Sequence, residues 1–379
     1  MRLNLMHAAI AAAFVAGAGA AGAQTVVKLG HVGPLTGAIA HLGKDNEAGA
    51  KMAIDELNAK KLKIGGQEVK FELLSEDDAA DPKQGTAAAT KLVDAKVAGV
   101  IGHLNSGTSI PASKVYSDAG IPQISPSSTA PKYTQQGFKT TFRVVANDGQ
   151  LGSTLDRYAV KELKAKSIVV IDDRNAFGQG VADEFVKGVK AAGGQVVGRE
   201  YTNDKATDFN SILTKLKAKK PDVVFFGGMD AVGGPMMRQM KQLGIDARFM
   251  GGDGICTGEM AKLAGDALGE GKVICAEAGG IEGENVKAVE DFQARFKQKF
   301  NFDVKLYAPY VYDAVNTMVA AMQKADSTDP KKYLPELAKI KYNGVTGTIE
   351  FDQRGDLKNG ALTIYTFKGG QREKGRVVR

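Results

Sequence analysis

Two short loops rich in hydroxyl side chains are the segments of this chain best suited to binding chemistry. One is Asn-Ser-Gly-Thr-Ser at 105–109, and the other is Ser-Pro-Ser-Ser-Thr at 125–129. Each follows a short apolar run that predicts a strand, and open α/β sheets bind ligands where their strands end. Free N–H groups at a helix N-terminus, together with Ser and Thr hydroxyls, suit a carboxylate or a phosphate. Ser and Thr are also common helix N-caps, so either loop alone can be purely structural.

The absence of basic side chains from both loops narrows the kind of ligand. Phosphate sites usually contain Arg or Lys, and neither 105–109 nor 125–129 contains one. No Gly-Lys pair in the chain is followed by Ser or Thr, so the nucleotide-binding P-loop is missing as well. The loops therefore favour a zwitterion or a weak anion.

Residue types needed for catalysis or metal binding are scarce. The chain has 4 His and 2 Cys, and it contains neither Gly-x-Ser-x-Gly nor His-Glu-x-x-His. The widely spaced His31, His41 and His103 favour ordinary core or polar histidines over a shared metal. A Ser106 nucleophile would have only His103 or His41 as its base. We therefore expect no enzyme activity, no metal and no cofactor.

Length and composition predict a globular chain of two domains. The 379 residues are 43% hydrophobic and 25% charged, which suffices for at least one large core. Lys and Arg number 50 against 43 Asp and Glu, a net charge of +7 that we expect to be scattered over the surface. Such a small excess does not predict a nucleic-acid-binding stripe.

The first 23 residues have the pattern of a cleaved secretory signal. Arg2 precedes an uncharged apolar run from Ala8 to Ala20, and Ala-Gly-Ala follows at 21–23. A transmembrane anchor is the alternative, but the run is shorter than the ~20 apolar residues that a span needs. The mature chain is expected to start at Gln24. Because the first cysteine is Cys256, no lipid anchor is expected, and the protein is assigned to the periplasm.

The mature chain alternates short β-rich runs with segments of helical period, which predicts an α/β fold with parallel sheets. We expect strands at 26–31, 68–74, 98–102, 121–124, 167–172, 195–201, 222–227, 248–251, 273–276, 347–351 and 361–367. We expect helices at 46–59, 82–94, 107–118, 149–163, 178–192, 208–218, 234–243, 285–300 and 309–325. The rhythm restarts near 144–149, where a boundary between two lobes is expected.

The two cysteines suggest one covalent link. Cys256 and Cys275 stand 19 positions apart, and exported proteins fold under oxidising conditions, which favours a structural disulfide. Two unpaired thiols are the alternative, because sequence spacing alone does not fix the side-chain geometry.

Over its full mature length the chain resembles the periplasmic leucine/isoleucine/valine-binding proteins of branched-chain amino acid ABC transporters. The segments that carry the resemblance are 77–84, 101–104, 111–113, 124–131, 226–228 and 249–251. It implies a type I binding-protein fold, with two Rossmann-like lobes that have parallel-sheet cores, are joined by three crossovers and close on a ligand. The implied division is 1–23 for the signal peptide, 24–147 plus 277–360 for the N-terminal lobe, and 148–276 plus 361–379 for the C-terminal lobe.

The resemblance also implies roles at the ligand site. Ser106 and Thr129 match residues that bind the ligand α-carboxylate, and Thr129 also reaches the ammonium. Ser127 would offer its carbonyl to the ammonium, and Asp253 would pair with it where the family usually has Glu. The side-chain pocket and its neighbours would be formed by Leu42, Leu104, Asn105, Phe177, Met229 and Tyr307.

Two departures from the family pattern concern the ligand and the disulfide. Leu42, Phe177 and Met229 stand where well-known members often have tyrosine, which puts the ligand in question. Ala80 and Asn105 occupy the positions of a disulfide found in those members, so Cys256 and Cys275 would replace it on the other lobe.

The function that follows from the resemblance is delivery of a branched-chain or related aliphatic amino acid to an ABC permease. The partners would be that small ligand and the permease membrane subunits, and the chain would be a monomer that binds no nucleic acid. The alternative is a periplasmic receptor or sensor on the same fold, for an amide or a small organic acid.

Overall fold

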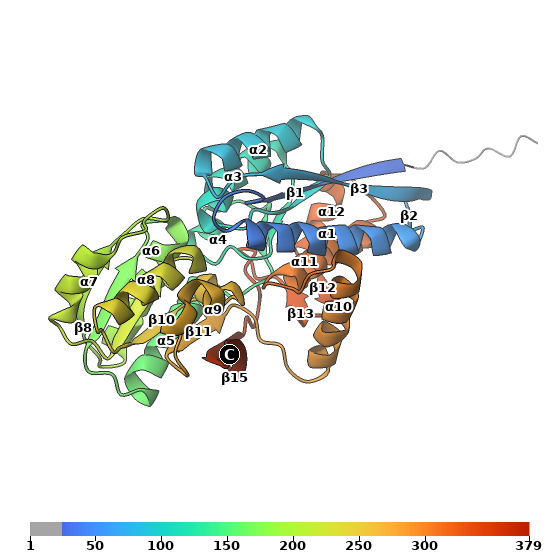
Figure 1. The fold of residues 1–379 in the computed structure, drawn as a ribbon. Coiled ribbons are helices and arrows are strands. Elements are labelled where there is room, and N and C mark those ends of the chain that lie inside the picture. The colour runs from blue at the N-terminus through green and yellow to red at the C-terminus, as the bar shows by residue number, and fades with distance from the viewer. Residues whose placement is uncertain (1–24, 379) are drawn as a thin grey trace, which may run out of the picture.

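The structure, a computed structural model, describes residues 25–378 and shows two lobes lying side by side. In Figure 1 one lobe is drawn from green to yellow, and the other combines blue segments with orange ones from late in the chain. The predicted signal peptide at 1–23 lies outside the described residues. No helix within 25–378 is both long and apolar enough to cross a membrane.

The sheet of the first lobe has the order β2-β3-β1-β4-β5-β6. Its strands are β1 (Thr25–Gly33), β2 (Lys63–Ile64), β3 (Gln67–Asp77), β4 (Gly99–Gly102), β5 (Gln123–Ser125) and β6 (Thr141–Arg143). All neighbours are parallel except β2 and β3, which form an antiparallel pair. Strands β4 and β5 are buried at every position, because helices cover both faces of the sheet.

Helices from both ends of the chain belong to this lobe. They are α1 (Ala40–Ala59), α2 (Pro82–Asp94), α3 (Ser106–Ala119), α4 (Lys132–Gln135), α10 (Glu284–Phe300), α11 (Ala308–Lys324) and α12 (Pro330–Leu337). A small antiparallel pair, β12 (Lys341–Asn343) and β13 (Thr348–Glu350), completes it. Helix α2 shows how local sequence sets a start, because Pro82 is its first residue and the Asp81 carboxylate accepts from the N–H groups of Lys83 and Gln84.

The sheet of the second lobe has the order β15-β14-β11-β10-β9-β7-β8. Its strands are β7 (Ile168–Asp172), β8 (Val196–Tyr201), β9 (Val223–Gly227), β10 (Arg248–Gly251), β11 (Val273–Glu277), β14 (Leu362–Lys368) and β15 (Gln371–Val378). Strands β8, β7, β9, β10 and β11 are parallel to one another, whereas β14 and β15 are antiparallel to their neighbours. The expected parallel core is therefore extended by an antiparallel edge.

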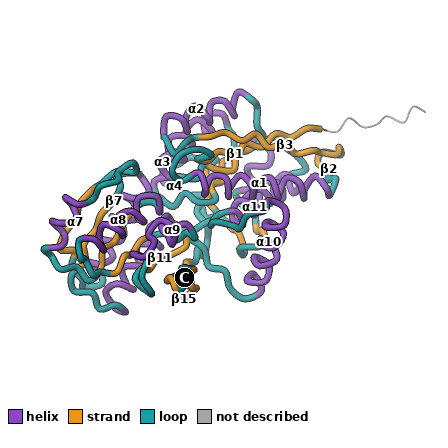
Figure 2. Tube along the Cα trace, in the orientation of Figure 1, coloured by secondary structure: helices purple, strands orange, loops and turns teal. Residues whose placement is uncertain are grey.

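The helices of the second lobe alternate with those strands along the chain, and they pack over the sheet, as Figure 2 shows. They are α5 (Asp148–Arg157), α6 (Ala176–Ala191), α7 (Asn210–Lys217), α8 (Asp230–Gln242) and α9 (Glu259–Ala264). A π-helical turn, Tyr158–Glu162, continues α5, and short 3-10 turns occur at Asp253–Ile255 and Gly265–Ala267. At the start of α5, Asn147 and Gln150 form a capping box.

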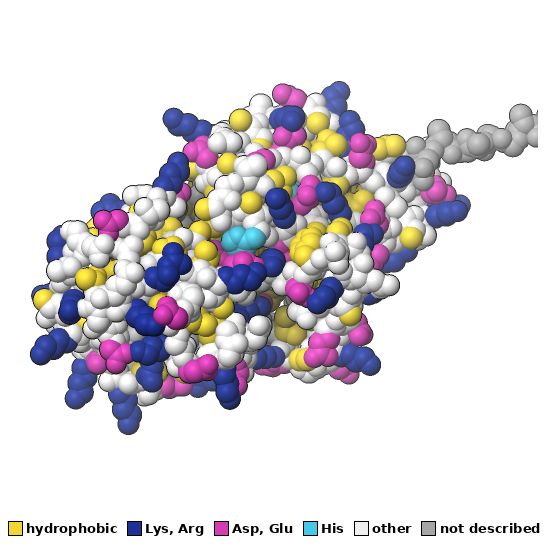
Figure 3. Space-filling view, in the orientation of Figure 1, with side chains coloured by type: hydrophobic (Ala, Val, Ile, Leu, Met, Phe, Trp, Pro, Cys, Tyr) yellow, Lys and Arg dark blue, Asp and Glu magenta, His cyan; other side chains and the backbone are white. Residues whose placement is uncertain are grey.

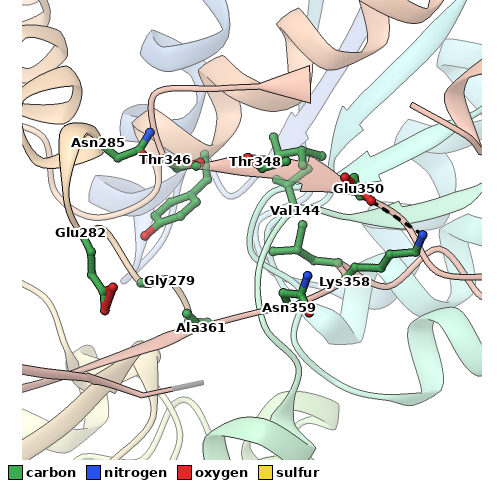
Figure 4. A pocket seen from close by; sticks show the side chains of 16 residues that line it. Val144, Gly279, Glu282, Asn285, Thr346, Thr348, Glu350, Lys358, Asn359 and Ala361 are labelled. Atoms are coloured by element: carbon green, nitrogen blue, oxygen red, sulfur yellow. Dashed lines mark ion pairs between the residues drawn. The ribbon is translucent and has the colours of Figure 1, made fainter. Parts of the chain in front are cut away.

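Three connections join the lobes, at 144–147, 278–283 and 351–361. All three contribute to a cavity of about 260 Å³, whose lining includes Val144, Gly279 and Asn359 (Figure 4). Glu350 and Lys358 form an ion pair at its rim, with 3.8 Å between Oε2 and Nζ. Because every connection contributes to its wall, this cavity lies at the hinge between the lobes.

A disulfide links Cys256 to Cys275 in the second lobe, with 5.3 Å between the Cα atoms. This confirms the predicted pairing and removes the alternative of two free thiols. The bond attaches the residue that follows the 3-10 turn Asp253–Ile255 to the central part of β11. It therefore braces the turn that carries Asp253.

Candidate functional site

The two hydroxyl-rich loops lie together, because they follow the neighbouring parallel strands β4 and β5. The Ser109 and Ser128 hydroxyl oxygens are 2.6 Å apart, and Ser125 Oγ donates to the His103 carbonyl over 2.8 Å. Ser127 Oγ donates to the Leu104 carbonyl over 2.9 Å. Most of these hydroxyls therefore tie one loop to the other, as the structural alternative predicts.

Two hydroxyls of the loops remain available for a ligand. Ser106 is the first residue of α3 and is buried, and its Oγ accepts from the Ala130 N–H over 3.2 Å, which leaves its own hydrogen free to donate. The buried Thr129 hydroxyl lies near the Asp148 carboxyl but makes no hydrogen bond of ordinary geometry within the described chain. The loops thus present two hydroxyl donors beside the free N–H groups of the α3 N-terminus.

A buried arginine holds the 125–130 loop in place from behind. Arg143, at the end of β6, donates from Nη1 to the Ser128 carbonyl over 2.6 Å and from Nη2 to the Ala130 carbonyl over 2.9 Å. Its Nε donates to Asp356 Oδ1 over 2.6 Å. Because these bonds flank Thr129 on both sides, Arg143 fixes the backbone position of Thr129, from which the hydroxyl projects. Arg143 belongs to no motif that would mark it in the sequence.

Asp253 comes from the opposite lobe, in the turn that follows β10, and is buried. Its Oδ2 accepts a hydrogen bond of 2.8 Å from the Tyr307 hydroxyl, while its Oδ1 has no partner within the described residues. Burial raises the pKa of Asp253 to about 7, and the Tyr307 hydroxyl opposes that rise. Tyr307, expected to line the side-chain pocket, therefore also contacts the acid directly.

A second buried carboxyl, Asp148, was missed in the sequence analysis. It is the first residue of α5, and its backbone N–H donates to the Thr129 carbonyl over 2.9 Å. Burial raises the pKa of Asp148 to about 8, with the Thr129 hydroxyl lowering it and the Asp253 carboxyl raising it further. Asp148 lies within 144–149, where the boundary between the lobes was expected. In the sequence, however, an acid in the first turn of a helix looks like ordinary helix capping.

Apolar side chains lie beside these polar groups. Phe177 and Met229, each 8% exposed, both border Gly254, where a Cβ would approach Phe177 Cε1 to 2.8 Å and Met229 Sδ to 2.9 Å. A side chain at this position would therefore push both residues out of place. Leu42 and Leu104 are buried and belong to the same hydrophobic cluster as Phe177, Met229 and Tyr307.

A cavity of about 170 Å³ opens between the lobes next to this apolar wall. Phe177 and Met229 line it from the second lobe, and Asn105 and Gly107 line it from the first. Asn105 is the N-cap position of α3, but its side chain does not cap the helix, and its buried Oδ1 has no partner within the described chain. Asn105 and Gly107 flank Ser106, so the cavity adjoins the hydroxyl site.

Polar contacts join the two lobes. The ring Nε2 of His41 on α1 lies 2.9 Å from Asp230 Oδ2 at the start of α8, and Thr257 also donates to that oxygen. Lys305 Nζ pairs with Glu259 Oε1 of α9 over 2.9 Å. Figure 3 shows histidine, basic and acidic side chains close together where the lobes meet. With these contacts formed, the two lobes are closed against each other.

His31 and His103, the other two histidines within 25–378, are core residues. The His103 ring lies 3.0 Å from both Asp78 Oδ2 and Tyr116 Oη, and His31 is fully buried. Within 25–378 no group of three or more His, Cys, Asp or Glu side chains has metal-binding geometry. The site combines hydroxyl and N–H donors on one lobe with a buried carboxyl on the other.

The model of the periplasmic binding protein family matches residues 26–372. The leucine-, isoleucine-, valine-, threonine- and alanine-binding protein of Pseudomonas aeruginosa is 36% identical over 367 residues, which are 97% of this chain and 96% of that protein. This chain belongs to the periplasmic binding protein family. The Pseudomonas aeruginosa relative is a binding protein.

Solved structures support the same fold. The leucine-binding protein LivK of Thermotoga maritima superposes with a TM-score of 0.85 at 26% identity, covering 93% of this chain and 98% of that one. LivJ of Streptococcus pneumoniae, solved in complex with isoleucine, has a TM-score of 0.83 at 26% identity and covers 93% of this chain and 99% of that one. The type I binding-protein fold, with two Rossmann-like lobes, is thereby established for this chain.

Proposed function

We propose that this chain is the periplasmic substrate-binding component of an ABC importer and binds a branched-chain or related aliphatic amino acid between its lobes. One observation carries the proposal. The buried Ser106 hydroxyl lies between Asn105 and Gly107, which line the interlobe cavity together with Phe177 and Met229. The same two apolar side chains border Gly254, which follows the buried Asp253, whose Oδ1 has no partner within 25–378. The relative from Pseudomonas aeruginosa and the isoleucine complex of LivJ support the ligand class.

The polar groups match the two charges of an amino acid. Ser106, Thr129 and the N-terminal N–H groups of α3 would bind the carboxylate, and Thr129 would also reach the ammonium. The Ser127 carbonyl would accept from the ammonium, and Asp253 would neutralise it. Both charges need partners, because burying an unpaired charge is costly.

The missed carboxyl, Asp148, belongs on the ammonium side of this site. It lies beside Thr129 and within electrostatic reach of Asp253. A ligand ammonium between the two acids would relieve their mutual repulsion and favour the ionised form of Asp253.

The apolar part of the site would select the side chain. No hydrogen-bond donor is present in the side chains of Leu42, Leu104, Phe177 and Met229, so they do not favour a polar ligand side chain. An aliphatic side chain gains ~25 cal/mol for each Å² of apolar surface that it buries here. Asn105 would lie at the edge of this pocket, where the cavity meets the α3 N-terminus.

Transport follows from closure. A closed pair of lobes around the ligand is a shape that permease membrane subunits can distinguish from the open one. We assign 24–147 plus 277–360 to the N-terminal lobe and 148–276 plus 361–379 to the C-terminal lobe, so that the boundaries fall at or beside the three connections. We further propose export through a cleaved signal at 1–23 without lipidation, and action as a monomer.

A thermal-shift screen tests the proposal. Mature protein is unfolded to strip bound ligand, refolded, and screened against the amino acids, short amides and small aromatic acids. A ligand that binds the folded state raises the melting temperature. The proposal predicts the largest shifts with leucine, isoleucine or valine. If only an amide or an acid without an amino group raises it, the assigned ammonium site is wrong.

A further inference from the structure

A carboxylate outside the ligand site holds the segment that bridges the lobes. Asp45 on α1 is fully buried. Its Oδ1 accepts from the Lys305 N–H over 2.8 Å, and its Oδ2 accepts from the N–H groups of Leu306, Tyr307 and Ala308 over 3.1, 2.8 and 2.9 Å. Ala308 is the first residue of α11 (Ala308–Lys324), Tyr307 is its N-cap, and Lys305 and Leu306 precede it, so no carbonyl of that helix accepts from these N–H groups. Asp45 therefore caps α11 from a different helix.

The segment 305–308 faces the second lobe. The Tyr307 hydroxyl donates to Asp253 Oδ2 over 2.8 Å, and Lys305 Nζ pairs with Glu259 Oε1 over 2.9 Å. Both acceptors lie on the stretch from the Asp253 turn to α9. The side chain of one residue on α1 thus holds the backbone from which two bridges between the lobes start.

We propose that Asp45 is a positioning residue for ligand binding, which holds Tyr307 against the Asp253 carboxyl and Lys305 against Glu259. The inference rests on the proposed function, in which Asp253 meets the ligand ammonium. Without the Asp45 carboxylate, four N–H groups, three of them buried, lose their acceptor, and the 305–308 segment loses its fixed position. Tyr307 then no longer stabilises the ionised form of Asp253, which the ligand needs.

Titratable groups face Asp253 from several elements. Tyr307 faces it from the start of α11, and Glu277 and Asp148 face it from β11 and α5. Glu277 is itself bonded to the Tyr310 hydroxyl over 2.8 Å and paired with Arg372 over 3.1 Å. Of the groups bonded to Asp253 within the described chain, Tyr307 is the one that depends on Asp45.

The chain offers a matched control for the structural cost of losing a buried carboxylate. Asp313 on α11 is also fully buried, and it accepts from the N–H groups of Val345 and Thr346 over 2.9 and 2.8 Å. The turn that it holds supplies none of the described residues bonded to Asp253 or Glu259. Asp313→Asn therefore removes a buried carboxylate that accepts from backbone N–H groups, but it leaves the Tyr307–Asp253 and Lys305–Glu259 contacts in place.

The first measurement uses the unliganded protein and does not depend on the identity of the ligand. Asp253 is titrated by the ¹³C chemical shift of its carboxyl carbon in aspartate-labelled wild type, Asp45→Asn, Asp313→Asn and Tyr307→Phe. We expect the midpoint to rise by roughly one pH unit in both Asp45→Asn and Tyr307→Phe. It should stay at the wild-type value in Asp313→Asn. Asp45→Glu, which keeps the charge but lengthens the side chain, replaces Asp45→Asn if that variant does not fold.

The second measurement is leucine binding by calorimetry at pH 7. Asp45→Asn and Tyr307→Phe should each weaken binding roughly ten- to a hundredfold, and the double variant should bind no more weakly than the weaker single one, since all three lose the same bond. Asp313→Asn should lose stability without losing affinity. The proposal is overturned if Asp45→Asn leaves both the Asp253 midpoint and the affinity unchanged, or if Asp313→Asn reproduces its effects. Failure of the wild type to bind leucine, isoleucine or valine would contradict the proposed function, while the titration would still decide the role of Asp45.

Discussion

Tyr307 and Asp253 belong to different lobes, and a hydrogen bond of 2.8 Å joins them inside the interlobe site. The bond occupies one carboxyl oxygen of Asp253 and leaves the other, Oδ1, without a partner within the described chain. An acid held this way is oriented from behind by a neutral donor while one oxygen stays available for a cation. The affinity of the site should therefore depend on the charge of Asp253.

Replacing Asp253 should abolish most of the affinity for an amino acid. Asp253→Asn keeps the shape of the side chain but leaves the ligand ammonium unpaired, at a cost of about 2–5 kcal/mol in binding free energy. Calorimetric titration with leucine measures the loss. Asp266→Asn is the control, because Asp266 belongs to the same lobe but pairs with Lys241 at the surface. Equal affinity in the wild type and Asp253→Asn would remove Asp253 from the site.

The affinity should rise with pH through neutrality. Burial raises the pKa of Asp253 to about 7 in the unliganded protein, so the carboxyl is mostly protonated at pH 6 and must release that proton to pair with an ammonium. Leucine affinity should fall about tenfold for each pH unit below 7 and level off above 8. Titrations between pH 5 and 9 measure this profile. A flat profile would contradict the account, as would one that falls with rising pH.

The same group should make the unliganded protein less stable as the pH rises. The pKa of Asp253 in the folded state, about 7, exceeds its ordinary value of 3.8, so the fold binds a proton that the unfolded chain has released. Its contribution to the free energy of unfolding is greatest at low pH and is lost as the pH rises through 7. Urea unfolding at pH 5 and 8 should show a larger decrease in the wild type than in Asp253→Asn. An equal decrease in both proteins would show that Asp253 is not the titrating group.

Opening the disulfide should destabilise the second lobe. Cys256 and Cys275 close a loop with a sequence separation of 19, for which chain entropy predicts a loss of ~3 kcal/mol in the free energy of unfolding. The double variant Cys256→Ser/Cys275→Ser should therefore melt at a lower temperature than the oxidised wild type. Adding a reductant should lower the melting temperature of the wild type and leave that of the double variant unchanged. The same response to reductant in both proteins would show that the bond does not form in solution.

The contact between His41 and Asp230 should favour the closed lobes. His41→Ala removes the hydrogen bond to a buried carboxylate and should shift the unliganded chain toward an open form, by roughly 1 kcal/mol. Small-angle X-ray scattering would detect this shift as a larger radius of gyration. The control is Lys114→Ala, which breaks an exposed ion pair within α3. If both variants scatter alike, the contact does not control closure.

The sequence predicts the framework well where apolar runs are buried. The bounds of β10 and α2 agree with the expected ranges 248–251 and 82–94. The elements that were not expected are short or exposed, among them β15, whose sequence Gln-Arg-Glu-Lys-Gly-Arg-Val-Val has polar side chains at five of its eight positions. Such a strand is defined by its antiparallel pairing with β14, a long-range relation that local pattern does not contain.

Helix ends were harder to predict than helix cores. Helix α1 begins at Ala40 rather than 46, without a capping side chain to mark the start. The expected helix 149–163 divides into α5 and a π-helical turn at Tyr158–Glu162. Both differences arise where packing rather than local sequence sets the backbone.

The site was foreseen in part. Ser106 and Thr129 could be proposed because loop position and family resemblance agree, and Asp253 could be proposed from the resemblance alone. Asp148 and Asp45 could not, since each looks like an ordinary helix residue until the two lobes are assembled around it. Their importance comes from contacts between segments far apart in the chain.

The most direct test of the account is calorimetry on stripped mature protein with three matched compounds. L-leucine carries both charges, leucine amide lacks the carboxylate, and 4-methylpentanoic acid lacks the ammonium but keeps the aliphatic chain. The account predicts that leucine binds and that each analogue binds at least roughly a hundredfold more weakly, because a buried charge of the site loses its partner. Binding of 4-methylpentanoic acid as tight as that of leucine would contradict a zwitterion site formed by Ser106, Thr129 and Asp253.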